Sequence, residues 1–573
     1  MKMKKLNIII IALLAGLSSC TDKFLEINTN PNSTNTIDPA YLFTTSQRRG
    51  AMDDRVYYYT RGMASFHSQM YANTNYTKEH CTDRYQFNGA WNGTIWGAAY
   101  AGDASKTYLS YVAEAEKIAK KNGMDNKEAT CAIWKSFLFL QLTDLFGDIP
   151  YSQAFDDMID YPKYDTQESI YAGIYAKLKE SNTKLDAAKG NGMGNADLFY
   201  AGDYGSWKRF SNSVRLRMAM RISGVNPTLA KTWFDETVAD AAGLMTTNNQ
   251  SCRLRTDPAG PQGIHSDNPI KVMANAFDWF RVSEFMITTL NTLQDPRMFN
   301  YAEPTKKYLD AMKGICRNLQ QNTALYVTLT SAEQDKVSYF ASEGSSFINV
   351  YAQGRYFTDD VDAIIARVLP GRVAEVNRNI KYRGVRNGQS IESLTAMQSK
   401  LGEYSDLSQY LRQDNYPTNL FMYPEVCFLL AEASLNGWST PKSAEENYND
   451  GIRAAMQLYE VPETEITTYL AGTAKFKTGG TKEQKLEQII LQKYLGNYTD
   501  GFEAYCDLRR TGYPQILPIE YVTSVADEMG LPRRWKYPSD EHLLNKENVI
   551  EAANRMGGDY QQSRMWWDKF TRP

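Results

Sequence analysis

Histidine is scarce in this chain, and the few histidines do not form a catalytic pattern. There are 4 in 573 residues (His67, His80, His265 and His542), and none has the spacing of a metal-binding pair. Neither Gly-x-Ser-x-Gly nor His-Glu-x-x-His occurs. The 66 acidic residues guarantee some close carboxylate pairs by abundance alone, so such pairs are no evidence of glycoside hydrolysis. We therefore expect a protein that is not an enzyme and that needs neither a metal nor another cofactor.

An excess of positive charge is also missing. The chain has 63 lysines and arginines against 66 acidic residues, a formal net charge of -3. A nucleic-acid-binding surface needs a basic footprint, so nucleic acid is excluded as a partner. After Leu17 no apolar run approaches the length of a membrane-spanning helix. Contact with lipid is therefore expected only at the N-terminus.

The 7 cysteines lack the C-x-x-C spacing of zinc and redox sites. Cys131 and Cys427 lie in apolar helical runs, where a free thiol behaves as a small buried hydrophobic group. We expect structural thiols at these positions. An exported protein can also form disulfides, and the irregular spacings leave their pairing open.

The one long apolar run lies at the N-terminus. Lysines precede the stretch from Ile8 to Leu17, and Leu17-Ser-Ser-Cys20 follows it. A basic start, a short apolar core and small residues are typical of an export signal, and the final cysteine resembles the bacterial lipobox. We expect a signal peptide over residues 1–19, lipidation of Cys20, and a lipidated tether over 20–39 that is rich in Asn, Thr and Pro. The open alternative is a secreted protein in which Cys20 has no role.

Apolar residues recur at helical spacing over most of the remaining chain, so the predicted fold class is mostly α, with antiparallel helix pairs. The clearest predicted helices cover 40–70, 97–121, 127–146, 167–188, 207–222, 227–243, 282–293, 424–435, 443–459 and 482–495. Asp165, Asn226 and Thr481 are the predicted N-caps of three of them. The stretches 246–280 and 325–386 lose the helical period and are predicted to be long connections, with room for a short hairpin near Leu325.

Six segments resemble motifs of the SusD/RagB family of nutrient-binding outer-membrane lipoproteins, and they follow the lipobox in the family's order. They are Cys20–Asn32, Leu142–Tyr151, Trp207–Ser223, Tyr423–Ala433, Asp500–Pro514 and Leu531–Asp568. Each segment is weakly diagnostic by itself, whereas six in order are specific. The Asn-Thr-Asn-Pro-Asn sequence in the first segment is similar to the opening of one branch of the family.

The resemblance implies one SusD-like nutrient-binding domain over 40–573. In it, tetratricopeptide-like helix pairs form an α/α superhelix that carries long ligand-facing loops and minor β-structure. It also implies a lipid-anchored, outward-facing protein of the outer membrane that captures an oligosaccharide, with a peptide as the less favoured ligand. The implied partner is a SusC-like TonB-dependent transporter, over which the protein sits as a lid. Family members bind without catalysis, and their motif segments mainly hold the scaffold together.

An oligosaccharide site needs aromatic faces for the C–H surfaces of sugar rings and polar side chains for the hydroxyl groups. The stretch from Tyr71 to Trp91 has this mixture and is predicted to be a loop, and relatives bind ligands in the comparable region. Phe277-Asp-Trp-Phe280 is the second candidate segment. The candidate binding residues are Tyr71, Asn73, Asp83, Arg84, Trp91 and Trp279, with Asn75 and Tyr76 beside them. The tryptophans on helical faces are expected in the core, namely Trp96, Trp134 and Trp207.

Charged residues on the motif helices are expected to form ion pairs or to be solvated rather than to bind ligand. They are Arg215, Arg217 and Arg221, and the similar group from Asp507 to Arg510 is expected to pair internally. Gly147 and Pro150 are read as a helix stop and a turn. Two other functions stay open: a glycoside hydrolase, and a tetratricopeptide-type structural lipoprotein of the envelope.

Overall fold

The computed structural model describes residues 37–52, 57–74, 84–85, 89–100, 107–255, 268–277, 280–342, 354–373, 381–388, 400–519 and 530–569. The predicted signal peptide, Cys20 and most of the predicted tether lie outside these ranges. Helices make up most of the described chain and its strands are short, which confirms the predicted fold class. In the described ranges, no helix combines the length and apolar character needed to span a membrane.

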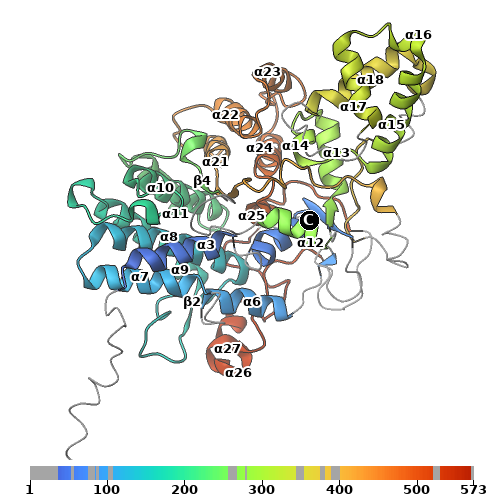
Figure 1. Ribbon diagram of the computed structural model, residues 1–573. Coiled ribbons are helices and arrows are strands. Elements are labelled where there is room, and N and C mark those ends of the chain that lie inside the picture. The colour runs from blue at the N-terminus through green and yellow to red at the C-terminus, as the bar shows by residue number, and fades with distance from the viewer. Residues whose placement is uncertain are drawn as a thin grey trace, which may run out of the picture.

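The first half of the chain forms a layer of helices, drawn in blue to green in Figure 1. Its members are α3 (Pro39–Met52), α6 (Gly89–Ala99), α7 (Leu109–Lys121), α8 (Asp125–Phe146), α9 (Gln167–Lys184), α10 (Tyr204–Arg221) and α11 (Pro227–Val238). Consecutive helices from α7 to α11 pack against each other, as expected for helix pairs. Helix α8 is central, because it contacts α3, α7, α9 and α10 and is buried almost all round.

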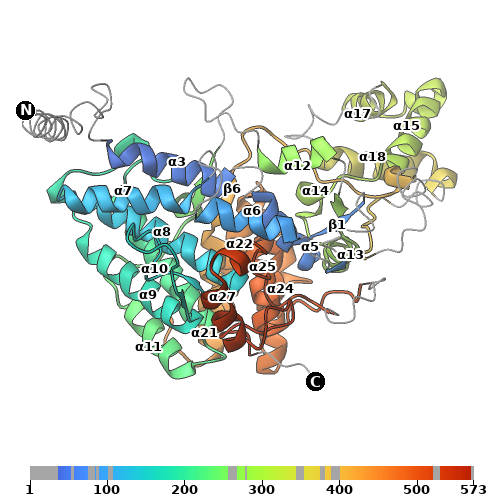
Figure 2. The same ribbon diagram turned by 90° about the horizontal axis from the view of Figure 1, so that it is seen from below.

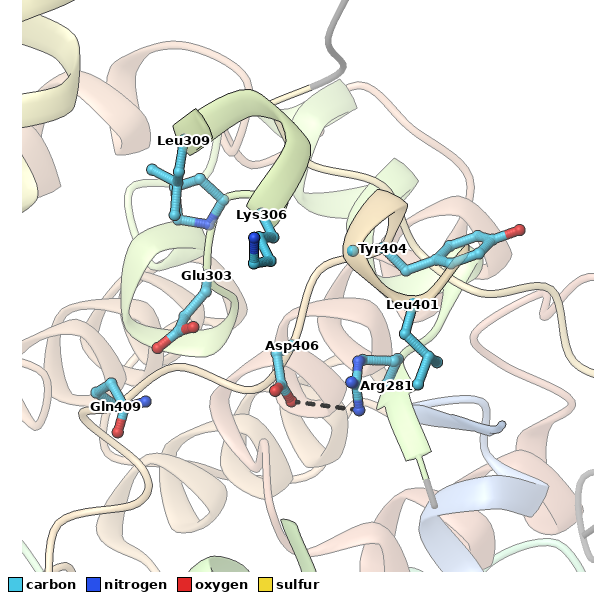
Figure 3. Close-up of a pocket in the computed structure, with 10 residues that line it drawn as sticks. Arg281, Glu303, Lys306, Leu309, Leu401, Tyr404, Asp406 and Gln409 are labelled. Carbon is cyan, nitrogen blue, oxygen red and sulfur yellow. Dashed lines mark ion pairs between the residues drawn. The ribbon is translucent and has the colours of Figure 1, made fainter. Parts of the chain in front are cut away.

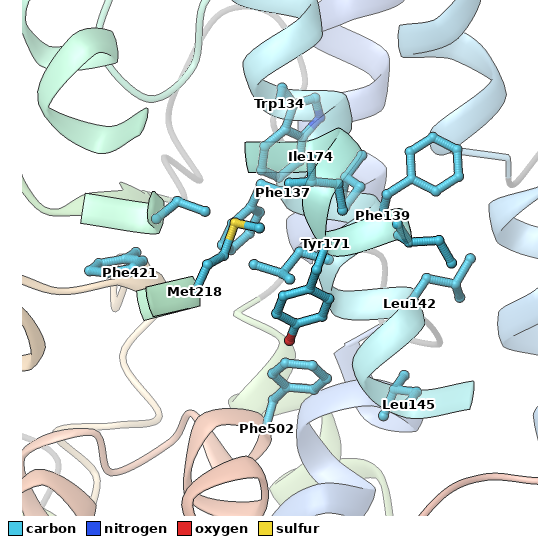
Figure 4. Packing of buried hydrophobic residues seen from close by; sticks show 14 of the residues in the cluster. Trp134, Phe137, Phe139, Leu142, Leu145, Tyr171, Ile174, Met218, Phe421 and Phe502 are labelled. Carbon is cyan, nitrogen blue, oxygen red and sulfur yellow. The ribbon is translucent and has the colours of Figure 1, made fainter. Parts of the chain in front are cut away.

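Aromatic and aliphatic side chains fill the space around α8. Trp134 and Trp207 are fully buried there and Trp96 is 6% exposed, which confirms their predicted place in the core. Figure 4 shows Phe137 and Tyr171 between the helices of this cluster. Burial of one large apolar side chain contributes roughly 2–3 kcal/mol. Many such side chains are buried around α8, so this core holds the surrounding helices in place.

A second group of helices comes mainly from the C-terminal half and occupies the middle of Figure 1. It consists of α5 (Met63–His67) after the π-helical turn η1 (Tyr58–Gly62), α12 (Pro269–Phe277), α13 (Glu284–Leu293), α14 (Met298–Tyr301), α21 (Tyr423–Leu435), α22 (Ala444–Gln457), α23 (Glu463–Ala471), α24 (Lys482–Gly496) and α25 (Gly501–Thr511). Helices α21, α22 and α24 pack on one another around a second hydrophobic core. The short helices α26 (Glu541–Leu544) and α27 (Lys546–Arg555) follow, and the tail after them places Trp567 in the first core.

A buried ionic network joins the two groups of helices. Arg217 of α10 binds Glu425 of α21 at 2.7 Å and Glu503 of α25 at 3.1 Å. Arg221, one turn later, binds Glu503 at 2.7 Å and lies 3.8 Å from Asp144 of α8. Further pairs extend the network: Lys493–Asp507, Arg510–Glu432 and Arg510–Asp507. All these side chains are 6% exposed or less.

The ionic network gives a structural role to most of the motif segments found in the sequence. Four of the six segments supply its residues, because α8, α10, α21 and α25 meet at this point. The predicted ion pairing of Arg217, Arg221 and Arg510 is therefore confirmed, whereas the solvation predicted for Arg217 and Arg221 is wrong. Arg215 behaves in the same way, since its buried side chain pairs with Asp240 at 3.2 Å. The sequence of one helix reveals that it has a polar face. It does not reveal that polar side chains of other helices cover that face.

Four helices form a separate bundle, at the upper right of Figure 1 and again to one side in Figure 2. They are α15 (Lys306–Gln321), α16 (Thr323–Tyr326), α17 (Ser331–Ser342) and α18 (Gly354–Val368), around a small core of their own. The predicted long connection over 325–386, with its hairpin near Leu325, is wrong here. Helix α17 shows why, because only Val337, Phe340 and Ala341 of its 12 residues are buried, too few to give a clear helical period.

Strands occur as three two-stranded antiparallel ribbons in the described chain. They pair β1 (Tyr71–Asn73) with β5 (Phe280–Val282), β2 (Ile149–Pro150) with β3 (Tyr164–Asp165), and β4 (Cys252–Leu254) with β6 (Thr418–Phe421). The predicted connection over 246–280 is also partly wrong, because β4 and α12 lie within it. Each ribbon is too short to be recognised from alternation of polar and apolar residues.

Helix ends follow the predicted signals in most cases. Asn226 caps α11, whose first residue is Pro227, and Thr481 forms a reciprocal capping box with Gln484 at the start of α24. Helix α9 is capped by Thr166 rather than by the predicted Asp165, whose carboxylate instead accepts hydrogen bonds from the backbone N–H groups of residues 151 and 152. Gly147 ends α8 with a φ of 84°, which confirms the predicted stop. The five described cysteines are buried free thiols, and Cys131 and Cys427 are among them.

Candidate functional site

The ribbon β1–β5 brings together the two candidate segments found in the sequence. Asn73 is paired with Phe280, Ala72 with Arg281 and Tyr71 with Val282, although about 200 residues separate the strands in the chain. Trp279 immediately precedes this pairing and itself lies outside the described residues, as do Asp83, Asn75 and Tyr76. The candidate segments therefore share one ribbon.

The described candidate residues have different environments. Tyr71 is 2% exposed, and its ring packs on Phe280 with centroids 4.9 Å apart, so it supports the ribbon from the core side. Asn73 is partly exposed at the end of β1, and Arg84 is buried at 5% exposure. The predicted loop from Tyr71 to Trp91 is wrong at both ends, because Tyr71 is in β1 and Trp91 is in the first turn of α6.

A cavity of about 300 Å³ adjoins the ribbon, and Figure 3 shows its lining. We call it the ribbon cavity. Three segments form it: β5, the residues that lead into the first turn of α15, and the irregular segment after the 3-10 turn η8 (Leu401–Glu403). The lining residues are Arg281, Glu303, Pro304, Lys306, Leu309, Leu401, Gly402, Tyr404, Asp406 and Gln409. The cavity therefore lies where the α15–α18 bundle joins the body of the protein.

Backbone hydrogen bonds hold the three segments in place. Val282 N–H donates to the carbonyl of Ser405 at 3.3 Å, and Glu303 N–H donates to the carbonyl of Asp406 at 2.9 Å. The segment containing Asp406 therefore runs between β5 and the entry to α15. This arrangement fixes the spacing of the acidic and basic side chains around the cavity without a regular sheet.

Charge in the ribbon cavity is balanced. Arg412 lies 3.3 Å from a carboxylate oxygen of Asp406 and 3.5 Å from one of Glu303, and Arg281 lies 3.8 Å from Asp406. Burial raises the pKa of Glu303 to about 7, with a further rise from the neighbouring Asp406 and a partial reduction from Arg412. Near neutral pH the Glu303 carboxyl can therefore act both as a hydrogen-bond donor and as an acceptor.

The lining suits a hydroxyl-rich ligand. Carboxyl, guanidinium, ammonium and amide groups alternate with the apolar side chains of Leu309 and Leu401, so donors and acceptors face a partly apolar floor. In the described part of the chain, no cluster of three or more His, Cys, Asp or Glu residues could hold a metal ion. Glu303, Asp406 and Gln409 were not predicted from the sequence, because nothing distinguishes them there from the other polar residues of irregular segments.

Comparison with known proteins identifies the fold. A SusD-like family model, described as "Starch-binding associating with outer membrane", matches residues 31–357 and 364–538. Among solved structures, a chitin-binding protein is 25% identical with a TM-score of 0.70, covering 93% of this chain and 100% of its own. A search of curated proteins finds no match.

Two further solved structures share the fold across nearly their whole length. A chitin-binding SusD homolog from Flavobacterium johnsoniae is 24% identical with a TM-score of 0.70, covering 94% of this chain and 99% of its own. A SusD homolog from Bacteroides uniformis is 23% identical with a TM-score of 0.71, covering 93% and 100%. Since the family model matches most of the sequence and the helical scaffold agrees, the chain belongs to the SusD-like family.

Proposed function

We propose that this protein is a nutrient-binding lipoprotein of the outer-membrane surface. It captures an oligosaccharide and delivers it to a SusC-like TonB-dependent transporter. The proposal rests on one structural observation in a member of a family described as starch-binding: the β1–β5 ribbon pairs the start of the first candidate segment with the end of the second, beside a polar cavity. Starch-type and chitin-type oligosaccharides are the first ligands to test, because the family description and two of the similar structures name them.

The proposed binding surface combines the ribbon cavity with the ends of the candidate segments. Asp406 and Gln409 supply hydrogen bonds to hydroxyl groups, and Trp91 and Trp279 supply faces for sugar rings. Such a surface holds a chain through several weak subsites, so moderate affinity is expected. A ligand that must later pass to a transporter requires this kind of reversible capture.

Affinity electrophoresis and calorimetry against malto-oligosaccharides, chito-oligosaccharides and oligopeptides test the proposal, with protein lacking residues 1–20. We expect Trp279→Ala or Trp91→Ala to weaken binding by about tenfold, and Asp406→Asn or Gln409→Ala to weaken it severalfold. Tyr41→Ala is the matched control, because Tyr41 is 73% exposed on α3 and outside the cavity. Binding that survives all four substitutions in folded protein would refute this site.

The same samples separate the alternatives. Cleavage of a glycan by clean protein would support a glycoside hydrolase, and binding of peptides in place of glycans would change the ligand class. A protein that binds neither but still associates with envelope proteins would be a structural lipoprotein.

Surface attachment through Cys20 is tested independently. We expect Cys20→Ala to release the protein from the membrane fraction, because the acyl chains that anchor the proposed lipoprotein are attached to that cysteine. Unchanged retention without detectable acylation would contradict the lipid anchor and leave the binding proposal standing.

A further inference from the structure

A second cavity, of about 590 Å³, lies among helix ends where the two hydrophobic cores meet. The end of α21, the first residues of α11 and α24 and the last residues of α25 surround it. We call it the Trp438 cavity. Trp438 packs against the first core and Leu435 against the second. This cavity shares no lining residue with the ribbon cavity.

Trp438 is held rigidly at the edge of this cavity. Helix α21 ends in a turn in which Gly437 has a φ of 76° and Trp438 N–H donates to the carbonyl of Ala433 at 3.1 Å. The indole ring leans on Phe234 with centroids 5.1 Å apart. Its side chain is partly exposed, and no described residue accepts a hydrogen bond from its ring N–H. The cavity is therefore bordered by the aromatic face of Trp438, whose ring N–H can donate a hydrogen bond to a ligand.

Polar groups surround this aromatic face. At the floor, the guanidinium of Arg510 makes a two-point ion pair with Glu432, and both side chains are 6% exposed. At the rim lie Asn436, Lys482 and Glu483. Glu483 accepts a hydrogen bond from the hydroxyl of Tyr513 at 2.7 Å. The side-chain amide of Asn436 and the ammonium of Lys482 make no hydrogen bond to any described residue.

This combination matches a sugar ring better than a peptide. The apolar face of a pyranose stacks on an indole, and its equatorial hydroxyls need a mixture of donors and acceptors around the edge. A peptide would instead require a free strand edge or a series of apolar pockets. The cavity offers one aromatic face and a mixed rim, and its volume lies within the range of about 300–1,000 Å³ typical of small-ligand sites.

We propose that the Trp438 cavity is a second carbohydrate-binding site, at which one sugar ring stacks on Trp438 and its hydroxyls bind Asn436 and Lys482. For the class of ligand, this inference rests on the proposed function. Two sites on one chain raise the effective concentration of a long glycan at the ribbon cavity, because a glycan held at either site is kept close to the other.

The test follows the fluorine NMR resonance of Trp438 itself. The protein lacking residues 1–20 is labelled with 5-fluorotryptophan, and the resonance of Trp438 among the 10 tryptophans is assigned as the one missing from Trp438→Phe. Maltotriose and chitotriose are the probes, because each is too short to join separate sites. We expect one of them to shift the Trp438 resonance in a saturable way. Asn436→Ala or Lys482→Ala should raise the Kd obtained from that resonance at least about threefold.

Matched variants and a peptide probe decide the outcome. Lys485→Ala, on the same helix as Lys482 but outside the cavity, should leave that Kd unchanged. A glycan that shifts other tryptophans but not Trp438 overturns this inference and leaves the proposed function intact. A Trp438 shift produced by a tripeptide and by neither trisaccharide also overturns it. If neither glycan is bound anywhere on the protein, both proposals fail.

Discussion

Among single residues, Glu303 has a raised pKa whose effect on stability can be tested by changing the pH. Its pKa of about 7 lies above the value of roughly 4.3 for an unfolded glutamate, so between these two pH values only the folded chain keeps the proton. The stability that this proton contributes is complete below about pH 4 and is lost as the pH rises through 7. Replacement by glutamine, which is neutral at every pH, should remove this dependence.

We therefore expect the free energy of unfolding of Glu303→Gln, relative to the original protein, to increase by about 1–3 kcal/mol between pH 5 and pH 8.5. Urea unfolding at the two pH values measures this difference. The measurement at pH 5 is the internal control, because both side chains are then largely neutral in the folded state. A difference that does not change with pH would show that Glu303 titrates normally.

Residue type and spacing could predict some side-chain environments and not others. Trp134 and Trp207 lie on helical faces with several apolar neighbours, so their burial follows from the periodicity. Tyr71 could not be placed in the core in this way, because the residues that cover its ring, such as Phe280 and Tyr498, are more than 200 positions away in the chain. Glu303 and Asp406 depend in the same way on a contact between distant segments.

At the scale of elements, the capping box at the start of helix α22 allows the contribution of a local helix signal to stability to be measured. Ser443 accepts a hydrogen bond from the Glu446 N–H, and the Glu446 carboxylate accepts one from the Ser443 N–H. We expect Ser443→Ala to lower the free energy of unfolding by about 1 kcal/mol, since it leaves a helix N–H without its acceptor. Glu445→Gln, in the same turn but outside the box, should change it by no more than a few tenths. Chemical denaturation compares the two, and equal effects would mean that the box contributes nothing.

The ionic network between helices should be far more sensitive. Arg217→Met removes the closest cationic partner of the buried Glu425 carboxylate and one of the two arginines that pair with Glu503, so we expect a loss of about 3–5 kcal/mol in the free energy of unfolding. Arg209→Met on the same helix is the control. Its partner Asp203 is 3.7 Å away and both side chains are substantially exposed, so the expected loss is below about 1 kcal/mol. Similar losses in the two variants would refute the special role of the network.

Helix starts were predictable because their signals are local, whereas packing partners were not. Asn226-Pro227 and Thr481-x-x-Gln484 specify helix starts within four residues. The polar face of α10 looked solvated in sequence because α21 and α25, which cover it, come more than 200 residues later. The β1–β5 ribbon, which defines the candidate site, likewise depends on a pairing between distant segments that no local pattern encodes.

At the scale of the whole molecule, the three largest hydrophobic cores of the described chain imply units of different stability. Within the α15–α18 bundle, helix α17 was hidden in the sequence, because only three of its residues are buried in the small core of the bundle. The other two cores share helices α21 and α25 and are joined by the ionic network. The bundle has no part in that network among the described residues, so it should open at a lower free energy than the body.

Phe340→Ala tests this separation. Phe340 is 2% exposed in the bundle core, and its truncation should cost about 3–5 kcal/mol locally. We expect hydrogen exchange to accelerate at amides of α15 and α17 and to stay unchanged in α8 and α10, because the cavity created touches only the bundle. Val327→Ala, at a position 70% exposed beside α16, should leave all four helices unchanged. Equal acceleration of α8 and α17 would instead mean that bundle and body unfold as one unit, and the ribbon cavity between them would then be a fixed site.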